Sequence, residues 1–142
     1  MLQVEDLYEG ISRDKMDAYR SEAMAKWGKD TVHSVEDTLR SFSKQEMETL
    51  KQDLNDITAR LTTLMTSDPA SDEVQQCIAQ RYQIILRITG GKITMDKLEY
   101  FRKLGELYVE DNRYTPVNGM PSMELALFIK EATAYYVRQL RK

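Results

Sequence analysis

Apolar residues recur at intervals of three and four along most of the chain, which is the spacing of an amphipathic helix. The longest run follows residues 43–46, Ser-Lys-Gln-Glu, which have the pattern of a helix-capping box. Its apolar positions are Met47, Leu50, Leu54, Ile57, Leu61, Leu64 and Met65. No segment alternates between apolar and polar residues over a length that would predict a β-strand. The pattern therefore predicts an all-α fold.

The first part of the chain carries a weaker pattern. Residues 1–11 hold apolar residues among acids and indicate a connecting segment or a short helix. A helix is predicted after Ser12, a suitable N-cap, and Gly28 ends it in a left-handed cap. In the polar, weakly periodic segment that follows, Ser34 and Asp37 loosely resemble a capping box. We expect this part of the chain to be held less tightly than the remainder.

Residues 43–142 carry the stronger helical pattern. Three more helices follow the capping-box helix, and each is predicted to begin at a residue that can cap it. These predicted caps are Ser71, Thr94 and Ser122. Loops that contain proline or glycine separate the helices, since proline cannot continue a helical ladder. The whole chain is predicted to hold about five to six helices that pack on one another.

Composition and charge exclude several functions. The 142 residues predict one domain, and the net charge is only −3. Lysines and arginines are interleaved with acids, so no basic face for duplex DNA is predicted. A single cysteine, Cys77, excludes an internal disulfide and favours a reducing, cytoplasmic location. The acidic N-terminus does not resemble a signal peptide, and no apolar run approaches membrane-spanning length.

Few residues are candidates for catalysis. His33, the single histidine, lies in a polar segment, which is typical of a solvated side chain. Cys77 lies among apolar positions and has no histidine nearby in sequence, a pattern typical of an inert buried thiol. The Gly90-Gly91 pair lacks the lysine and hydroxyl of a phosphate-binding loop. We therefore predict no enzyme activity, no metal site and no cofactor.

Large, adaptable apolar side chains are abundant, with eight methionines and eight tyrosines. Methionine is flexible and polarizable, and tyrosine combines a wide ring with a polar tip, so both suit a cavity for varied ligands. Several of them cluster in one helix–loop–helix stretch: Tyr100, Phe101, Tyr108, Tyr114, Met120 and Met123. Two interpretations remain open for this stretch, because its side chains can fill the core or line a pocket.

Three motifs resemble those of a known family. Residues 22–28, EAMAKWG, resemble the E-x-x-x-x-W-G motif of the TipAS-type antibiotic-recognition domain. Residues 104–115, LGELYVEDNRYT, resemble its more specific L-A/G-x-M/L-Y-V-x-D-x-R-F/Y-T signature. Residues 8–11, YEGI, resemble the F-x-G-F that precedes its first helix. The likeness extends over roughly residues 8–140 with matching order and spacing.

The resemblance implies the effector domain of a MerR-family, multidrug-responsive transcription activator. Such a domain is an all-α, globin-like helical bundle without haem, which binds bulky hydrophobic or peptide-like antibiotics in a cleft. Its N-terminal helices are mobile until a ligand orders them. This implies a connecting segment at 1–11, a mobile helical lid at 12–42 and a helical ligand-binding core at 43–142. In full-length members a winged helix-turn-helix and a dimerising coiled coil precede the domain, so DNA binding and a homodimer would depend on segments absent from this chain.

The sequence departs from the family at two positions. Members that capture ligands covalently carry a cysteine at the position that falls on or near Asp96 here, and no cysteine is nearby. A position that is often histidine is Phe101 in this chain. We therefore expect an apolar or aromatic ligand that is held non-covalently. Seven residues are predicted to contact it: Trp27, Phe101, Leu104, Tyr108, Tyr114, Met120 and Met123.

Three functions are compatible with these patterns. The leading hypothesis is a drug-sensing domain of a transcription activator, whose ligand orders the N-terminal helices. A stand-alone protein that confers resistance by sequestering antibiotic would use the same site without a DNA partner. A helical interaction module would instead pair with another chain through the apolar stripe of residues 47–65, which keeps a heptad-like rhythm for nearly three heptads.

Overall fold

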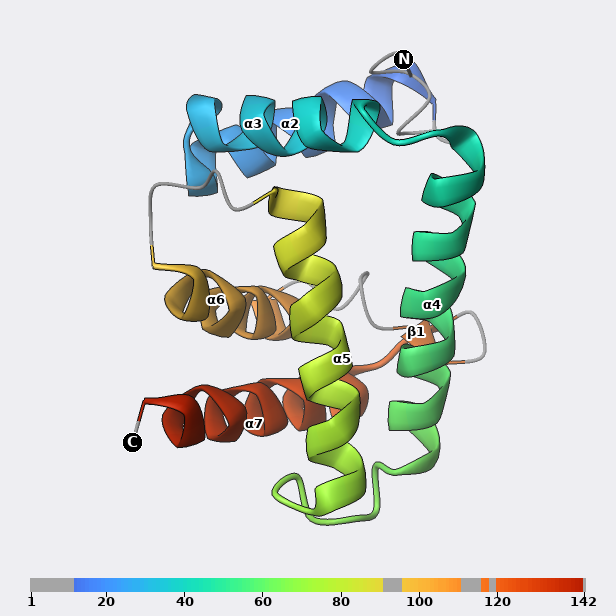
Figure 1. Ribbon diagram of the computed structural model, residues 1–142, viewed down its shortest axis with the longest axis vertical. Helices are drawn as coiled ribbons and strands as arrows, with labels where there is room; N and C mark the ends of the chain where they lie inside the picture. Colours follow the sequence, from blue (N-terminus) through green and yellow to red (C-terminus); the bar gives the residue numbers. More distant parts are fainter. Residues whose placement is uncertain (1–11, 91–95, 111–115, 118–119, 142) are drawn as a thin grey trace. The chain divides into compact units, whose positions relative to one another are not determined.

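The computed structural model describes residues 12–90, 96–110, 116–117 and 120–141. Within these residues it contains six α-helices, which confirms the all-α prediction (Figure 1). They are α2 (Arg13–Trp27), α3 (Lys29–Arg40), α4 (Lys44–Thr63), α5 (Asp72–Thr89), α6 (Lys97–Glu110) and α7 (Met123–Leu140). Two strands of two residues each, β1 (Pro116–Val117) and β2 (Met120–Pro121), form an antiparallel pair. A strand of two residues is too short to show an alternating pattern, so the hydrophobic pattern did not predict this pair. The globin-like arrangement stays a prediction.

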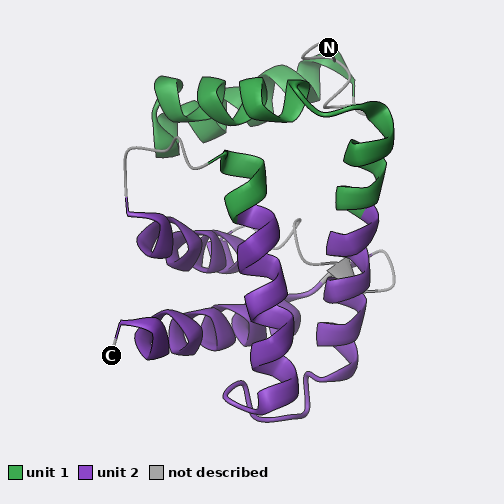
Figure 2. Ribbon diagram, in the orientation of Figure 1, with its two compact units in different colours: residues 1–51, 86–94 green, residues 52–85, 95–142 purple. Residues whose placement is uncertain are grey.

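The chain divides into two compact units, which Figure 2 distinguishes by colour. Unit 1 comprises Met1–Lys51 and Leu86–Thr94, and unit 2 comprises Gln52–Ile85 and Met95–Lys142. Helices α4 and α5 therefore contribute residues to both units. The predicted lid, residues 12–42, falls within unit 1.

Gly28 determines how the first two helices of unit 1 meet. It ends α2 with a positive φ of 92°, and its N–H donates to the Met24 carbonyl at 2.9 Å. The same glycine precedes Lys29, the first residue of α3, so a new helix begins at once. The prediction of a capping box at Ser34 and Asp37 is therefore wrong, because both residues lie inside α3. Glycine suits this position because it lacks Cβ and therefore adopts a positive φ at no steric cost.

A buried ion pair joins α2 to α3. Arg20 of α2 donates to both carboxylate oxygens of Glu36 of α3, from Nε at 2.8 Å and from Nη2 at 2.9 Å. The Glu36 side chain is only 7% exposed. The apolar side chains buried on these two helices are Met16 and Val32. The Arg20–Glu36 pair therefore stands beside a small fully buried apolar contact between α2 and α3.

Capping interactions place the longer helices. The predicted capping box of α4 is confirmed, because the Glu46 N–H donates to Ser43 Oγ at 3.1 Å and the Ser43 N–H donates to Glu46 Oε1 at 3.4 Å. The predicted N-cap of α7 is also confirmed, since Ser122 Oγ accepts from the Leu125 N–H at 3.2 Å. Each such bond satisfies a backbone donor that has no partner within its own helix.

Two predicted caps differ from the structure. Ser71 directly precedes α5, but its hydroxyl is buried and has no hydrogen-bond partner among the described residues. Its carbonyl instead accepts from the Gln75 N–H at 2.9 Å. Thr94 lies outside the described residues, and α6 begins later than predicted, at Lys97. The capping side chain there is Asp96, which accepts from the Leu98 N–H at 3.1 Å.

The core of unit 2 is apolar and is built from α4, α5, α6 and α7. Its buried members are Ile57, Leu61, Val74, Cys77, Ile78, Phe101, Leu125, Phe128, Ile129, Ala132 and Val137. Helix α6 packs along α7 (Figure 1), and Gly105 lies at their closest approach. A Cβ at Gly105 would lie 3.4 Å from Lys130 Cα and 3.5 Å from Thr133 Cβ. This spacing leaves room for a methyl group and for nothing larger.

The Arg20–Glu36 pair yields a first prediction. Glu36→Gln removes the charge that balances Arg20 while conserving size, and it should lower the free energy of unfolding of unit 1 by ~2 kcal/mol. Trp27 ends α2 and is the only tryptophan, so urea unfolding followed by its fluorescence reports on this unit. The control is Asp37→Asn, because the Asp37 side chain is 73% exposed and its loss should change little. Equal effects of the two variants would show that the buried pair does not hold α2 and α3 together.

The packing at Gly105 yields a second prediction. Gly105→Ala should raise the free energy of unfolding by ~0.5–1 kcal/mol, because alanine favours the helix and its methyl group fits. Gly105→Leu should lower it by ~2 kcal/mol, because the larger side chain would force α6 away from α7. Thermal unfolding followed by circular dichroism measures both changes. Equal tolerance of alanine and leucine would contradict the close approach.

Candidate ligand-binding site

Helix α6 brings the aromatic cluster together. Phe101 is fully buried, and its ring centroid lies 5.0 Å from that of Tyr82 on α5 and 6.0 Å from that of Tyr136 on α7. The Tyr82 and Tyr136 rings are 5.7 Å apart. These tilted and edge-to-face arrangements are the ones aromatic rings favour. Three helices are thus held together by three mutually contacting rings.

A buried arginine adjoins this cluster. Arg81 of α5 is only 6% exposed, and its Nη2 donates to the Tyr108 hydroxyl at 2.6 Å. Its guanidinium carbon lies 5.1 Å from the Tyr108 ring centroid and 6.0 Å from that of Phe101, which are cation–π distances. The Nη1 atom is buried and has no hydrogen-bond partner in the part of the chain that the structure describes.

Burial keeps the neighbouring phenols neutral. Burial, with a smaller contribution from the nearby Tyr108, raises the pKa of Tyr100 to about 12. Burial also raises the pKa of Tyr82, with a smaller upward contribution from the Asp96 carboxylate. The pKa of Tyr136 rises for the same main reason. The phenols of Tyr82, Tyr100 and Tyr136 are therefore neutral at neutral pH.

The residues predicted to contact the ligand differ in how deeply their side chains are buried. On α6, Phe101 is inside the core of unit 2, whereas Leu104 and Tyr108 are half-buried. Met120 on β2 and Met123 at the start of α7 are 69% and 44% exposed, so both are accessible.

Two further predicted residues lie apart from α6 in the sequence. Trp27 ends α2 in unit 1, where it is half-buried with Lys26 Nζ 5.7 Å from its ring centroid. Tyr114 lies outside the described residues. Ligand contact by any of the seven residues stays a prediction.

Arg81 was missed by the sequence analysis, although the sequence holds a signal. The inward stripe of α5 runs through Val74, Ile78 and Ile85, and Arg81 falls between the last two at helical spacing. A charged residue at an inward position of an amphipathic helix is unusual, because a buried charge needs a partner. Such a break in the apolar stripe indicates a buried cation.

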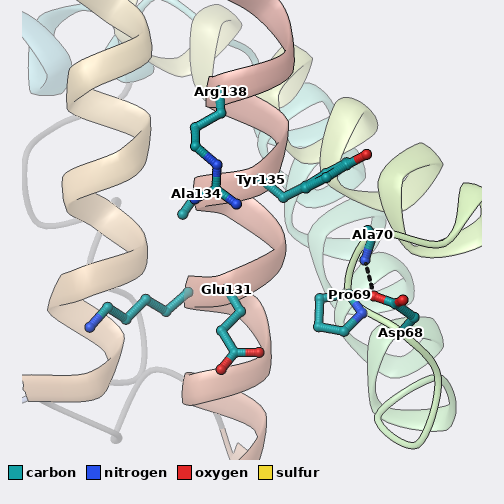
Figure 3. Close-up of a pocket in the computed structure, with 8 residues that line it drawn as sticks. Asp68, Pro69, Ala70, Glu131, Ala134, Tyr135 and Arg138 are labelled. Atoms are coloured by element: carbon teal, nitrogen blue, oxygen red, sulfur yellow. Dashed lines mark hydrogen bonds between the residues drawn. The ribbon is translucent and has the colours of Figure 1, made fainter.

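Two hollows of unit 2 lie away from this cluster. One, of about 370 Å³, lies between the loop at residues 68–70 and α7 (Figure 3). It is lined by Asp68, Pro69, Ala70, Lys130, Glu131, Ala134, Tyr135 and Arg138. The other, of about 440 Å³, lies between α4 and α5 and is lined by Asp53, Asp56, Ile57, Gln80, Gln83 and Ile84. Neither is lined by a predicted contact residue.

The remaining candidates from the sequence offer little chemistry. Cys77 is buried, and burial raises the pKa of its thiol, so it stays protonated at neutral pH. His33 lines a hollow of about 260 Å³ in unit 1, together with the ion pair of Arg20 and Glu36. Among the residues with described positions, no three acids, histidines or cysteines group in a way that could hold a metal ion.

None of the helices described is both long and apolar enough to cross a bilayer.

Comparison with known protein families identifies the family to which this chain belongs. Residues 19–136, most of the chain, match the TipAS antibiotic-recognition domain. The chain belongs to the TipAS antibiotic-recognition domain family. The resemblance carried by the motifs at 22–28 and 104–115 is thereby confirmed.

A comparison with curated proteins gives a similar result. The chain is 25% identical over 135 residues to the HTH-type transcriptional activator mta of Bacillus subtilis (strain 168). The match covers 92% of this chain and 51% of that protein, so the chain spans about half the length of this relative. No solved structure matches the chain significantly.

The buried phenol of Tyr100 yields a prediction about pH. Because its folded-state pKa of about 12 exceeds the ordinary value of 10.0, its contribution to stability is present below pH 10 and is lost as the pH rises to 12. This loss amounts to about 3 kcal/mol. Tyr100→Phe should therefore flatten the decline of unfolding free energy between these pH values, measured by urea titration. An unchanged slope in the variant would contradict burial of this phenol.

Proposed function

We propose that this chain is the effector domain of a MerR-type transcription activator and that it binds bulky hydrophobic, antibiotic-like ligands non-covalently. The match of residues 19–136 to an antibiotic-recognition family carries this proposal. Its relative is a transcriptional activator of about twice the length, which leaves room in such a protein for a separate DNA-binding part. DNA would thus be contacted through an N-terminal winged helix-turn-helix, in a homodimer in the cytoplasm.

The proposed binding surface is the half-buried face of α6. Leu104 and Tyr108 are four residues apart, so they lie on the same side of the helix. Tyr108 offers a ring whose position is set by its hydrogen bond from Arg81. Met120 and Met123 are exposed and flexible, and they would adapt to ligands of different shape. Phe101 is fully buried, so it supports this face from behind unless a ligand opens the core.

The proposed mechanism couples ligand binding to the order of unit 1. Helices α2 and α3 bury few apolar side chains, so a loosely held state of this unit lies close in free energy to the ordered one. A ligand that binds only the ordered state stabilises it by RT ln(1 + [L]/Kd). The population therefore shifts toward that state as ligand accumulates. In a dimeric activator this shift would be relayed to the promoter.

The proposal predicts which side-chain truncations weaken binding. A panel of hydrophobic antibiotics should contain ligands that raise the melting temperature and change Trp27 fluorescence. Tyr108→Ala should weaken their affinity about tenfold, since an aromatic contact of this kind contributes roughly 1–1.5 kcal/mol. Isothermal titration calorimetry measures the affinity independently of Trp27.

The matched control is Tyr135→Ala, which removes the same ring from the exposed hollow beside α7 (Figure 3). This variant should bind as the wild type does. Loss of affinity in Tyr135→Ala with none in Tyr108→Ala would move the site to that hollow. Absence of binding across the whole panel would count against antibiotic recognition altogether.

A further inference from the structure

We infer that the site prefers ligands that combine an aromatic or bulky apolar body with one anionic group, and that Arg81 binds this group. The inference deepens the proposed function and rests on it, because it names the chemistry of the ligand for the same face of α6. It begins from an electrostatic imbalance in unit 2, a buried cation to which no described acidic side chain is paired.

The charge of Arg81 persists despite burial. A buried lysine can lose its proton, but the guanidinium of arginine stays protonated in proteins. With 6% of its surface exposed, Arg81 has given up most of its hydration. Buried charges are normally paired with an opposite charge, because desolvation without compensation is costly. A stable binding partner for Arg81 is therefore an anion.

The contacts of Arg81 within the structure compensate this cost only in part. Its Nη2 donates to the hydroxyl of Tyr108, and the rings of Tyr108 and Phe101 lie at cation–π distances. None of these groups is a carboxylate, the usual partner of a buried guanidinium. The Nη1 atom remains buried without a hydrogen-bond partner among the described side chains. One donor edge of the guanidinium is thus unused.

Another arginine of the same unit is paired differently. Arg102 on α6 donates to Glu99 through Nε and Nη2 and to Glu106 through Nη1, and it is more exposed than Arg81. Two acids thus balance an arginine that water could also solvate. No described acid balances Arg81, which water reaches far less. No acid among the described residues supplies the counter-charge of Arg81, and the inference assigns that charge to the ligand.

The surroundings of Arg81 define the class of ligand. Carboxylates, sulfonates and phosphates are the anions that arginine binds with charge-assisted hydrogen bonds. The faces of Tyr108 and Phe101 beside the guanidinium favour a flat or apolar body next to that anion. An aromatic carboxylic acid, or a larger compound that carries such a group, meets both requirements.

Two dyes of matched shape test the inference. The anionic probe is 8-anilinonaphthalene-1-sulfonate, and the neutral probe is N-phenyl-1-naphthylamine, which has the same rings without the sulfonate. Fluorescence titration should show that the wild-type chain binds the sulfonate about tenfold more tightly than the neutral dye, the gain expected of one charge-assisted hydrogen bond. Arg81→Met should abolish this preference, so that the ratio of the two affinities falls from about ten to about one.

The control is Arg138→Met, which removes an exposed arginine from the hollow beside α7. It should keep the preference for the sulfonate. Dye-free Arg81→Met should melt at the same or a higher temperature, because methionine replaces a buried unpaired charge with an apolar side chain of similar length. If this variant fails to fold, that expectation is contradicted, and Arg81→Gln carries the binding test.

The outcomes separate the inference from the proposed function. Equal affinity of the wild-type chain for the two dyes would overturn the inference and leave the apolar binding site standing. A sulfonate preference that disappears in Arg138→Met and survives in Arg81→Met or Arg81→Gln would also overturn it, since the anion would then bind beside α7. Binding of neither dye would contradict both the inference and the proposed site.

Discussion

The packing of Phe101 against Tyr82 and Tyr136 is the contact on which the rest of unit 2 depends. It joins α5, α6 and α7 at one point, with every ring contributed by a different helix. Because Phe101 fixes the rotation of α6, it also fixes the position of Tyr108 two turns further along. Gly105 lets α6 approach α7 closely enough for these rings to meet. The position of the candidate site therefore follows from the way α5, α6 and α7 pack in the core.

The two units differ in what holds them together. Unit 2 has a continuous apolar core, whose stability changes little with salt or moderate pH. In unit 1, helices α2 and α3 rely on the ion pair of Arg20 and Glu36 and on a few apolar side chains. A part of the chain with little buried apolar surface is readily ordered or released by a ligand. This difference gives a physical basis for the proposed switch.

Most of the fold could be predicted from the sequence, because helical spacing and capping are local properties. Gly28 ended α2 as predicted, but its ψ of 148° is extended rather than left-handed, and its role in starting α3 was missed. Asp96 caps α6, whereas the predicted cap, Thr94, lies outside the described residues. Arg81 was missed for another reason: its importance depends on the absence of a nearby described acid. Pairing across helices is a tertiary property that spacing does not reveal.

The central claim is that α6 binds an apolar ligand while Arg81 binds its anionic group. A crystal structure of the chain with bound 8-anilinonaphthalene-1-sulfonate tests this claim most directly. The account predicts the rings of the dye against Tyr108 and a sulfonate oxygen within about 3 Å of Arg81 Nη1, the distance of a charge-assisted hydrogen bond. A dye seated in the hollow beside α7, with its sulfonate on Arg138 and the Arg81 guanidinium unchanged, would contradict it.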